Sequence, residues 1–287
     1  MKNIGALFEL LRWKHSLLIA AGLIVSGILS GDLAGLQPEY VVGFIIAFLI
    51  ASGSFAINDF YDVKIDALNG KQDRPLVSGL LNKRQALLTA IVAFVAVFFL
   101  TFLINPAAQI LVMASLSTYY LYSISLKKIF FLKNVLIAGA YPVVILLGTI
   151  LTDSIIEPLI IYFALMGFIV GLAAEILADI ADVDGDGMHG INTLATRLGV
   201  AAAARVSVVL FTVIIVMDPL PFFIELDANL NTDYIFLLVV LIPMLSYFFI
   251  SRALMDKTGP DVVRGLKKRV INTMQIGSAA YIIGVLL

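Results

Sequence analysis

The stretch VVGFIIAFLIASGSFAINDFYDVKID, residues 41–66, joins an apolar run directly to three aspartates. A helix needs about 20 mainly apolar residues to cross the hydrocarbon core of a bilayer, and the run at 40–58 has that length. Carboxylates in or beside a spanning helix are costly to insert, and such residues mark functional sites. The stretch therefore predicts a membrane-spanning helix with an acidic site at one end.

The whole chain has the composition of an integral membrane protein. Of its 287 residues, 61% are hydrophobic and 14% are charged, whereas a soluble domain has roughly 25% charged residues. Apolar runs recur over the full length, so we expect one polytopic domain over residues 1–287 and no separate signal peptide. Cysteine is absent, which excludes disulfides, thiol catalysis and cysteine-ligated metal. The formal net charge is −1, so partners are argued from where the charges sit. No nucleic-acid partner is expected, and the oligomeric state is left open.

The apolar runs and the charges between them predict the topology. Nine runs lie at 16–31, 40–58, 85–104, 107–124, 134–151, 158–178, 201–217, 234–251 and 268–287. All 19 Lys and Arg residues fall in the N-terminal segment, in the polar segments after runs two, four, six and eight, or, for Arg205, Lys268 and Arg269, at the start of the run that follows. By the positive-inside rule the N-terminus is then cytoplasmic and the C-terminus lies outside. We therefore predict an all-α protein of about nine transmembrane helices in the cell membrane.

A second acidic stretch, EILADIADVDGD at residues 175–186, follows run six as the first follows run two. Each stretch places three aspartates at steps of three and then four residues: Asp59, Asp62 and Asp66, and later Asp179, Asp182 and Asp186. Such steps keep side chains on one helical face. Asn58 joins the first face and Glu175 the second, whereas Asp184 points away. Both motifs are expected at the cytoplasmic ends of parallel spans.

Two acidic helix ends that repel each other need cations between them. Ligands that are all oxygen suit Mg²⁺, Mn²⁺ or Ca²⁺. Basic loops beside the acids favour Mg²⁺, or else Mn²⁺, bridging a polyanion, most naturally a diphosphate. A single carboxylate at a helix end is ordinarily a solvated loop charge, but a duplicated spacing on two spans is poorly explained in that way.

A calcium loop is the alternative for the second stretch. Asp182, Asp184, Asp186 and Gly187 match the first positions of that motif. Its last position should be Glu and is Thr193 here. A membrane-spanning run also precedes the stretch, so the two-helix metal clamp is favoured over the calcium loop.

The chain resembles the UbiA-type intramembrane prenyltransferases in three segments: NDFYDVKIDALN at 58–69, DRPLVSG at 73–79, and DIADVDGDGMHGINTLATRLG at 179–199. The resemblance implies nine helices around a central cavity and Mg²⁺-dependent transfer of a prenyl chain from an allylic diphosphate to an acceptor. The spacing of the first two segments looks closest to the archaeal lipid branch. Its members add a geranylgeranyl chain to geranylgeranylglyceryl phosphate. Val77 and Ala178 differ from the residues that are common in relatives. This difference concerns the identity of the acceptor more than the type of reaction.

The site expected from the chemistry and the resemblance has three parts. The predicted metal ligands are Asn58, Asp62, Asp66, Asp179, Asp182 and Asp186, of which Asp62, Asp66, Asp182 and Asp186 are assigned as catalytic. The predicted diphosphate-binding residues are Arg74, Lys127 and Tyr122. Asp59 and Glu175 are either ligands or residues that support the ligands.

Other polar residues have simpler explanations. Positive-inside topology accounts for the weaker candidates Arg12, Lys14 and Arg197. His15, beside Trp13, suits a membrane-interface anchor, and His189 lies in a glycine-rich loop, so neither is assigned to catalysis.

Two other functions compete with lipid prenylation. An aromatic prenyltransferase of quinone biosynthesis would use the same donor site. A cation transporter is the distant alternative, but transporter sites lie near the bilayer midplane between repeats, whereas both motifs here lie at one face. Donor and acceptor are both amphiphiles, so their tails are expected to enter from the bilayer lipids while their phosphates stay at the cytoplasmic face.

Overall fold

The computed structural model describes residues 2–33, 35, 37–153, 155–188 and 190–287. Within these ranges the regular structure is entirely helical. The chain divides into two compact units. Unit 1 comprises Met1–Gly27, Gly31–Ile129 and Val143–Ile155, and unit 2 comprises Ile28–Ser30, Phe130–Pro142 and Ile156–Leu287. The single-domain assignment stays a prediction.

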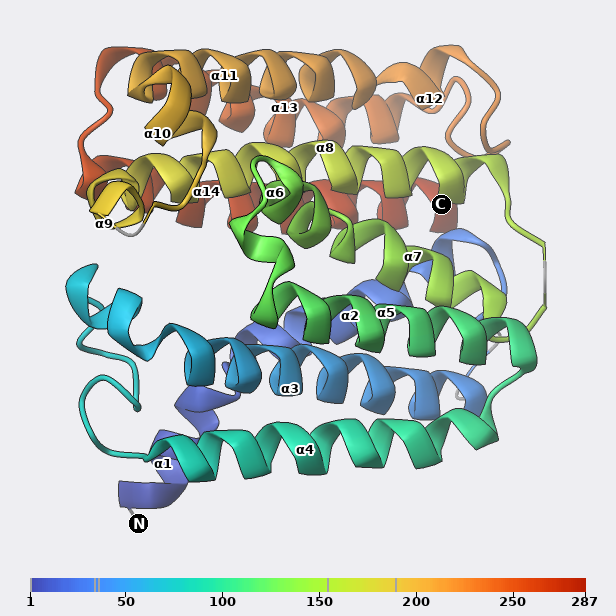
Figure 1. Cartoon of the computed structure of the whole chain (residues 1–287). Helices are drawn as coiled ribbons and strands as arrows, with labels where there is room; N and C mark the ends of the chain where they lie inside the picture. Colours follow the sequence, from blue (N-terminus) through green and yellow to red (C-terminus); the bar gives the residue numbers. More distant parts are fainter. Residues whose placement is uncertain (1, 34, 36, 154, 189) are drawn as a thin grey trace. The chain divides into compact units, whose positions relative to one another are not determined.

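Unit 1 holds the first acidic motif on a long helix. Its main elements are α1 (Lys2–Leu10), α2 (Trp13–Leu29), α3 (Pro38–Leu68), α4 (Lys83–Leu100), α5 (Pro106–Ile124), the 3-10 turns η1 (Thr101–Leu103) and η2 (Leu126–Lys128), and most of α7 (Ala140–Ile150). Helices α4 and α5 both pack against α3 (Figure 1). Proline at the first turn starts α3 and α5, and Asn105 caps α5.

Helix α3 is longer than the membrane requires. Its 31 residues extend about 47 Å at 1.5 Å per residue, whereas the hydrocarbon core is about 30 Å thick. The helix therefore continues through the first motif and ends only at Leu68, before Asn69. Asp59 and Asp66 are buried and Asp62 is half-buried, so this motif is a helical face, as predicted.

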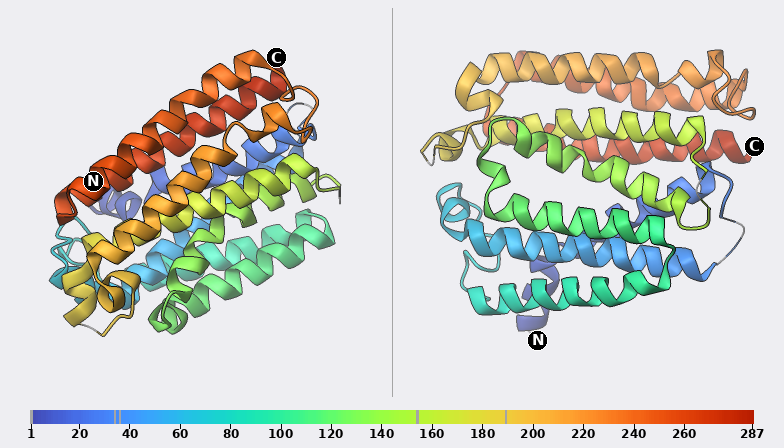
Figure 2. Two further views of the ribbon diagram at one scale, coloured as in Figure 1. Left: turned by 90° about the horizontal axis from the view of Figure 1, so that it is seen from above. Right: turned by 45° about the vertical axis from the view of Figure 1, so that its right-hand side comes forward.

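Unit 2 is built around α8. Its elements are α6 (Leu132–Ala138), α8 (Pro158–Ala181), α9 (Val183–Met188), α10 (Leu194–Leu198), α11 (Val200–Met217), α12 (Leu220–Phe223), α13 (Tyr234–Asp256) and α14 (Pro260–Leu286). Helix α8 packs against α6, α11 and α14, and α13 packs against both α11 and α14 (Figures 1 and 2). This places α8, which carries the second motif at its C-terminal end, in the interior of the unit.

Each of the nine predicted apolar runs falls on a helix or, for 134–151, on the successive helices α6 and α7. Among the described residues, six helical segments are long and apolar enough to cross a membrane, or seven if α1 and α2 form one bent span. The helices α5 and α14 fall outside that set; α14 has a strongly basic first half, which lowers its hydropathy. A multi-pass membrane protein is confirmed, and the number nine stays a prediction.

The second motif is not one continuous helical face, and here the sequence-based expectation is wrong. Helix α8 ends at Ala181, and Asp182 has φ −107° and ψ 12°. Asp186 lies on the separate helix α9. The break between the two helices is at Asp182, and Gly185 and Gly187 lie within the short helix α9. Asp186 is nevertheless buried and Asp184 exposed, so Asp184 points away as expected.

Candidate active site

Arg74 links two aspartates of the first motif. Its Nη1 lies 3.0 Å from Asp59 Oδ1 and also donates to Asp66. The two carboxylate side chains are 3% and 5% exposed, so they are nearly removed from water. Lys71 adds a second cation, with its Nζ 3.6 Å from Asp66 Oδ1. Arg74 was predicted to bind diphosphate, and the structure brings it to the motif through the loop that follows α3.

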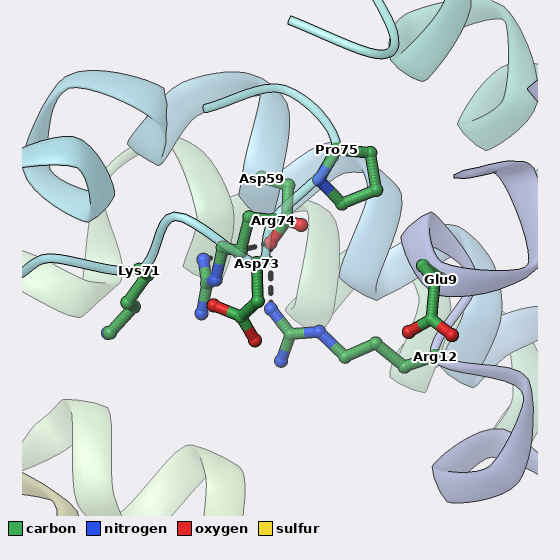
Figure 3. Close-up of a pocket in the computed structure, with 7 residues that line it drawn as sticks. All are labelled: Glu9, Arg12, Asp59, Lys71, Asp73, Arg74 and Pro75. Atoms are coloured by element: carbon green, nitrogen blue, oxygen red, sulfur yellow. Dashed lines mark hydrogen bonds and ion pairs between the residues drawn. The ribbon is translucent and has the colours of Figure 1, made fainter. Parts of the chain in front are cut away.

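Arg12 belongs to the same cluster, although the sequence analysis attributed it to positive-inside topology and not to the site. It lies between α1 and α2, and its Nη2 is 2.7 Å from Asp59 Oδ1 (Figure 3). The guanidinium lies 4.5 Å from the centroid of the Phe55 ring, a cation–π distance. Its backbone has φ 43°, which is uncommon for a residue with a side chain. Lys14 and Arg197 are exposed.

A polar pocket of about 290 Å³ opens beside this cluster. Its lining is Glu9, Arg12, Asp59, Lys71, Asp73, Arg74 and Pro75 (Figure 3). Three of these residues are cationic and three are acidic, and the acids include the buried Asp59 of the motif. A space of this size and polarity suits a charged headgroup rather than a prenyl chain.

Asp62 is paired separately from its neighbours in the motif. Lys127, on η2 after α5, donates to Asp62, and its Nζ lies 6.0 Å from the centroid of the Tyr61 ring. Lys128 is exposed, and Tyr122 on α5 is half-buried. The structure therefore brings the predicted Lys127 to the first motif, and it leaves the adjacent lysine in solvent.

The second motif has its own basic partners. Asp179 is fully buried, and both of its oxygens accept hydrogen bonds: Oδ1 from Lys133 Nζ at 2.6 Å and Oδ2 from Asn134 Nδ2 at 2.7 Å. Lys133 Nζ also lies 3.6 Å from Asp186 Oδ2. One lysine thus serves two of the predicted metal ligands.

Helix α14 supplies cations to the remaining acids of the second motif. Lys267 Nζ lies 3.0 Å from Glu175 Oε1, and Arg264 Nη2 lies 3.6 Å from Asp182 Oδ1. Three of these site residues were not predicted, because in the sequence they indicated only the membrane topology: Lys133, Arg264 and Lys267. Arg264 and Lys267 are three residues apart and share one helical face. Their spacing does not predict that this face packs against α8.

The two histidines were not assigned to catalysis. His15 is exposed, and His189 lies outside the described residues.

The donor chemistry fits a hard divalent cation. The predicted ligands are carboxylates and one amide, and Asn58 Oδ1 is buried with no hydrogen-bond partner among the described residues. Such an oxygen is a satisfactory ligand for Mg²⁺. In the part of the chain that the structure describes, no three acidic or imidazole side chains converge on one metal position. Each aspartate instead has a basic partner, so metal binding requires some of these ion pairs to open, and the ligand set stays a prediction.

These features define a class: an all-helical, multi-pass membrane protein with two acidic motifs, each neutralised by basic side chains. The chain belongs to the UbiA prenyltransferase family, whose model matches residues 16–264. It is accordingly a prenyltransferase.

Three comparisons extend this assignment. Digeranylgeranylglyceryl phosphate synthase of Archaeoglobus fulgidus is 28% identical over 283 residues, covering 99% of this chain and 96% of that protein. A digeranylgeranylglyceryl phosphate synthase structure in membranes is 22% identical, with a TM-score of 0.76 and coverage of 100% and 99%. A UbiA homolog from Archaeoglobus fulgidus bound to DMAPP and Mg²⁺ is 17% identical, with a TM-score of 0.70 and coverage of 96% and 98%. At these identities the two structural matches show a shared fold.

Proposed function

We propose that this prenyltransferase transfers a geranylgeranyl chain from geranylgeranyl diphosphate to the free hydroxyl of geranylgeranylglyceryl phosphate. The observation that carries the acceptor is the similarity over 99% of the chain to a relative named digeranylgeranylglyceryl phosphate synthase. The C–O bond between the allylic carbon and the diphosphate breaks, and an ether bond to the acceptor oxygen forms. The hydroxyl proton leaves to a base or to water, and diphosphate is released.

We further propose nine transmembrane helices, with the N-terminus and both motifs at the cytoplasmic face of the cell membrane and the C-terminus outside. The distribution of all 19 basic residues supports this orientation. The phosphates of two amphiphilic substrates would then remain in contact with cytoplasmic water while their chains stay among membrane lipids.

In this proposal divalent cations, Mg²⁺ or Mn²⁺, are held by oxygen ligands of each motif. The predicted ligands are Asn58, Asp62 and Asp66, and Asp179, Asp182 and Asp186. When bound, such an ion neutralises charge on the departing diphosphate. The homolog structure bound to DMAPP and Mg²⁺ supports this choice of metal.

The basic partners of the carboxylates have a second role in the proposal. Arg74 and Lys127 neutralise Asp59, Asp66 and Asp62 in this structure. Diphosphate is an alternative partner for these cations, and Tyr122 is proposed to donate to the same anion. Exchange of carboxylate for diphosphate would free the aspartates to bind metal, so donor and metal should bind together.

The proposed acceptor is tested with purified protein, Mg²⁺, geranylgeranyl diphosphate and a panel of acceptors, with products identified by mass. We expect the diether product from geranylgeranylglyceryl phosphate, together with released diphosphate. Alkylation of an aromatic acid on a ring carbon, with no diether, would instead assign the chain to aromatic prenylation. Transport of a cation without diphosphate release would contradict the prenyl transfer itself.

Lys127→Met tests the role of the cation beside Asp62. Because a hydrogen bond to a charged group contributes about 1.5–3 kcal/mol, we expect affinity for the donor diphosphate to fall by about 10–100-fold, measured as KM or by calorimetry. Lys128→Met, at the exposed neighbouring lysine, is the matched control and should change it less than twofold. Equal losses of affinity in both variants would show that Lys127 contributes only to the general surface charge.

A further inference from the structure

Helix α1 carries both buried and exposed apolar side chains. Ala6 and Leu10 are buried and belong to a core cluster that also includes residues of α3 and α4. At 100° per residue, Ile4 and Phe8 fall on another face, and Leu7 lies between that face and Leu10. The side chains of Ile4, Leu7 and Phe8 are 62%, 37% and 51% exposed. One face of α1 is therefore covered by unit 1, and another face is apolar and open.

The open face is continuous with a predicted membrane span. Helix α1 meets α2 at a bend of 48°, and on α2 the next outward side chains, Leu17 and Leu18, are also apolar and exposed. Helix α1 has nine residues, about 14 Å at 1.5 Å per residue, which is too short to cross a core of about 30 Å alone. A short helix that turns away from a spanning helix has the geometry of an interfacial segment.

The bend itself carries the side chains typical of a membrane interface. Trp13 is partly exposed, and its ring meets that of Phe8 edge to face at 6.3 Å between centroids. The Nζ of the exposed Lys14 lies 5.6 Å from the centroid of the Trp13 ring. Tryptophan is enriched at headgroup level, and a lysine beside it can extend its ammonium toward anionic headgroups.

We propose that α1 lies in the membrane interface, with Ile4, Leu7 and Phe8 inserted at the boundary of headgroups and acyl chains of an anionic lipid surface. The apolar face, its continuity with α2 and the Trp13–Lys14 pair all match this partner. The position of α1 in the interface also affects the first motif. Arg12 follows α1 within two residues and forms an ion pair with Asp59 at 2.7 Å. Lipid contact thus holds the backbone that presents Arg12 to the carboxylate.

The chain contains a single tryptophan, which allows a direct measurement of depth. The full-length protein is placed in nanodiscs containing anionic lipid, with bromine either near the headgroup end or near the methyl end of the acyl chains. Trp13 serves as the probe in the unmodified protein, and Phe8→Trp in a Trp13→Phe background reports on α1. Interfacial helices lie about 5–10 Å below the headgroups, so we expect quenching by the shallow bromine to be about twofold stronger than by the deep bromine.

Two matched controls calibrate the scale in the same Trp13→Phe background. Val92→Trp, on an exposed position near the middle of α4, reports the hydrocarbon core, and Lys257→Trp, in the exposed connection after α13, reports water. A probe at residue 8 that acrylamide quenches like the Lys257→Trp control overturns the proposal in favour of a solvated helix. Quenching that matches the Val92→Trp control overturns the proposal in favour of a bent span. Protection from acrylamide and from bromine at both depths also overturns it, because it indicates that protein covers this face.

Discussion

Replacing Asp62 with Asn should lower kcat by about 10²–10³-fold, the loss typical when one group that stabilises developing charge is removed. The substitution keeps the size of the side chain and removes its charge, so the protein should still fold. The same variant should lose Mg²⁺-dependent binding of a short, water-soluble allylic diphosphate, measured by calorimetry. Binding and turnover then fail together because metal and diphosphate share this carboxylate.

Two further variants separate catalysis from ion pairing. Asp184→Asn, at an exposed carboxylate of the second acidic stretch, should keep turnover within about twofold of the wild type, as expected for a surface position. Asp62→Asn combined with Lys127→Met removes both partners of the Asp62 ion pair. Recovery of turnover in this double variant would mean that Asp62→Asn lowers turnover only by leaving Lys127 unpaired. Near-normal turnover of Asp62→Asn itself would remove Asp62 from the proposed mechanism.

Replacing Lys133 with Met should destabilise the protein by about 3–5 kcal/mol, because it removes the cation beside a fully buried carboxylate. Asp179 is 0% exposed, and among the described residues only Asn134 then remains as a hydrogen-bond partner for its charge. We expect the midpoint of thermal unfolding in detergent to fall by about 10 °C. Lys128→Met, at an exposed lysine on η2, should change stability by less than about 0.5 kcal/mol.

The Lys133 variant also tests the proposed ligand set. If Asp179 binds a divalent cation, added Mg²⁺ should raise the unfolding midpoint of Lys133→Met more than that of the wild type, since the ion replaces the missing charge. Lys133→Met combined with Asp179→Asn should regain much of the lost stability, because no unpaired buried charge remains. A Lys133→Met protein as stable as the wild type would show that the pair at 2.6 Å contributes little.

The helices could be predicted because their signals are local. An apolar run of about 20 residues specifies a membrane helix wherever the chain goes, and each predicted run falls on helical residues. The first motif was predicted as a helical face for the same reason, since the steps between Asp59, Asp62 and Asp66 match the helical repeat. The prediction for the second motif was wrong at Asp186, because spacing assumes one continuous helix and the chain leaves the helical conformation at Asp182.

The membrane class, the duplicated aspartate motifs and the family could be predicted without a structure, because composition and spacing are properties of the chain. Which cation neutralises which acid depends on the packing of the helices. Arg12 reaches Asp59 across 47 residues, Lys133 reaches Asp179 across 46, and Lys267 reaches Glu175 across 92. The helical period relates side chains only within one helix, whereas these pairs depend on how separate helices pack and how far their long basic side chains extend.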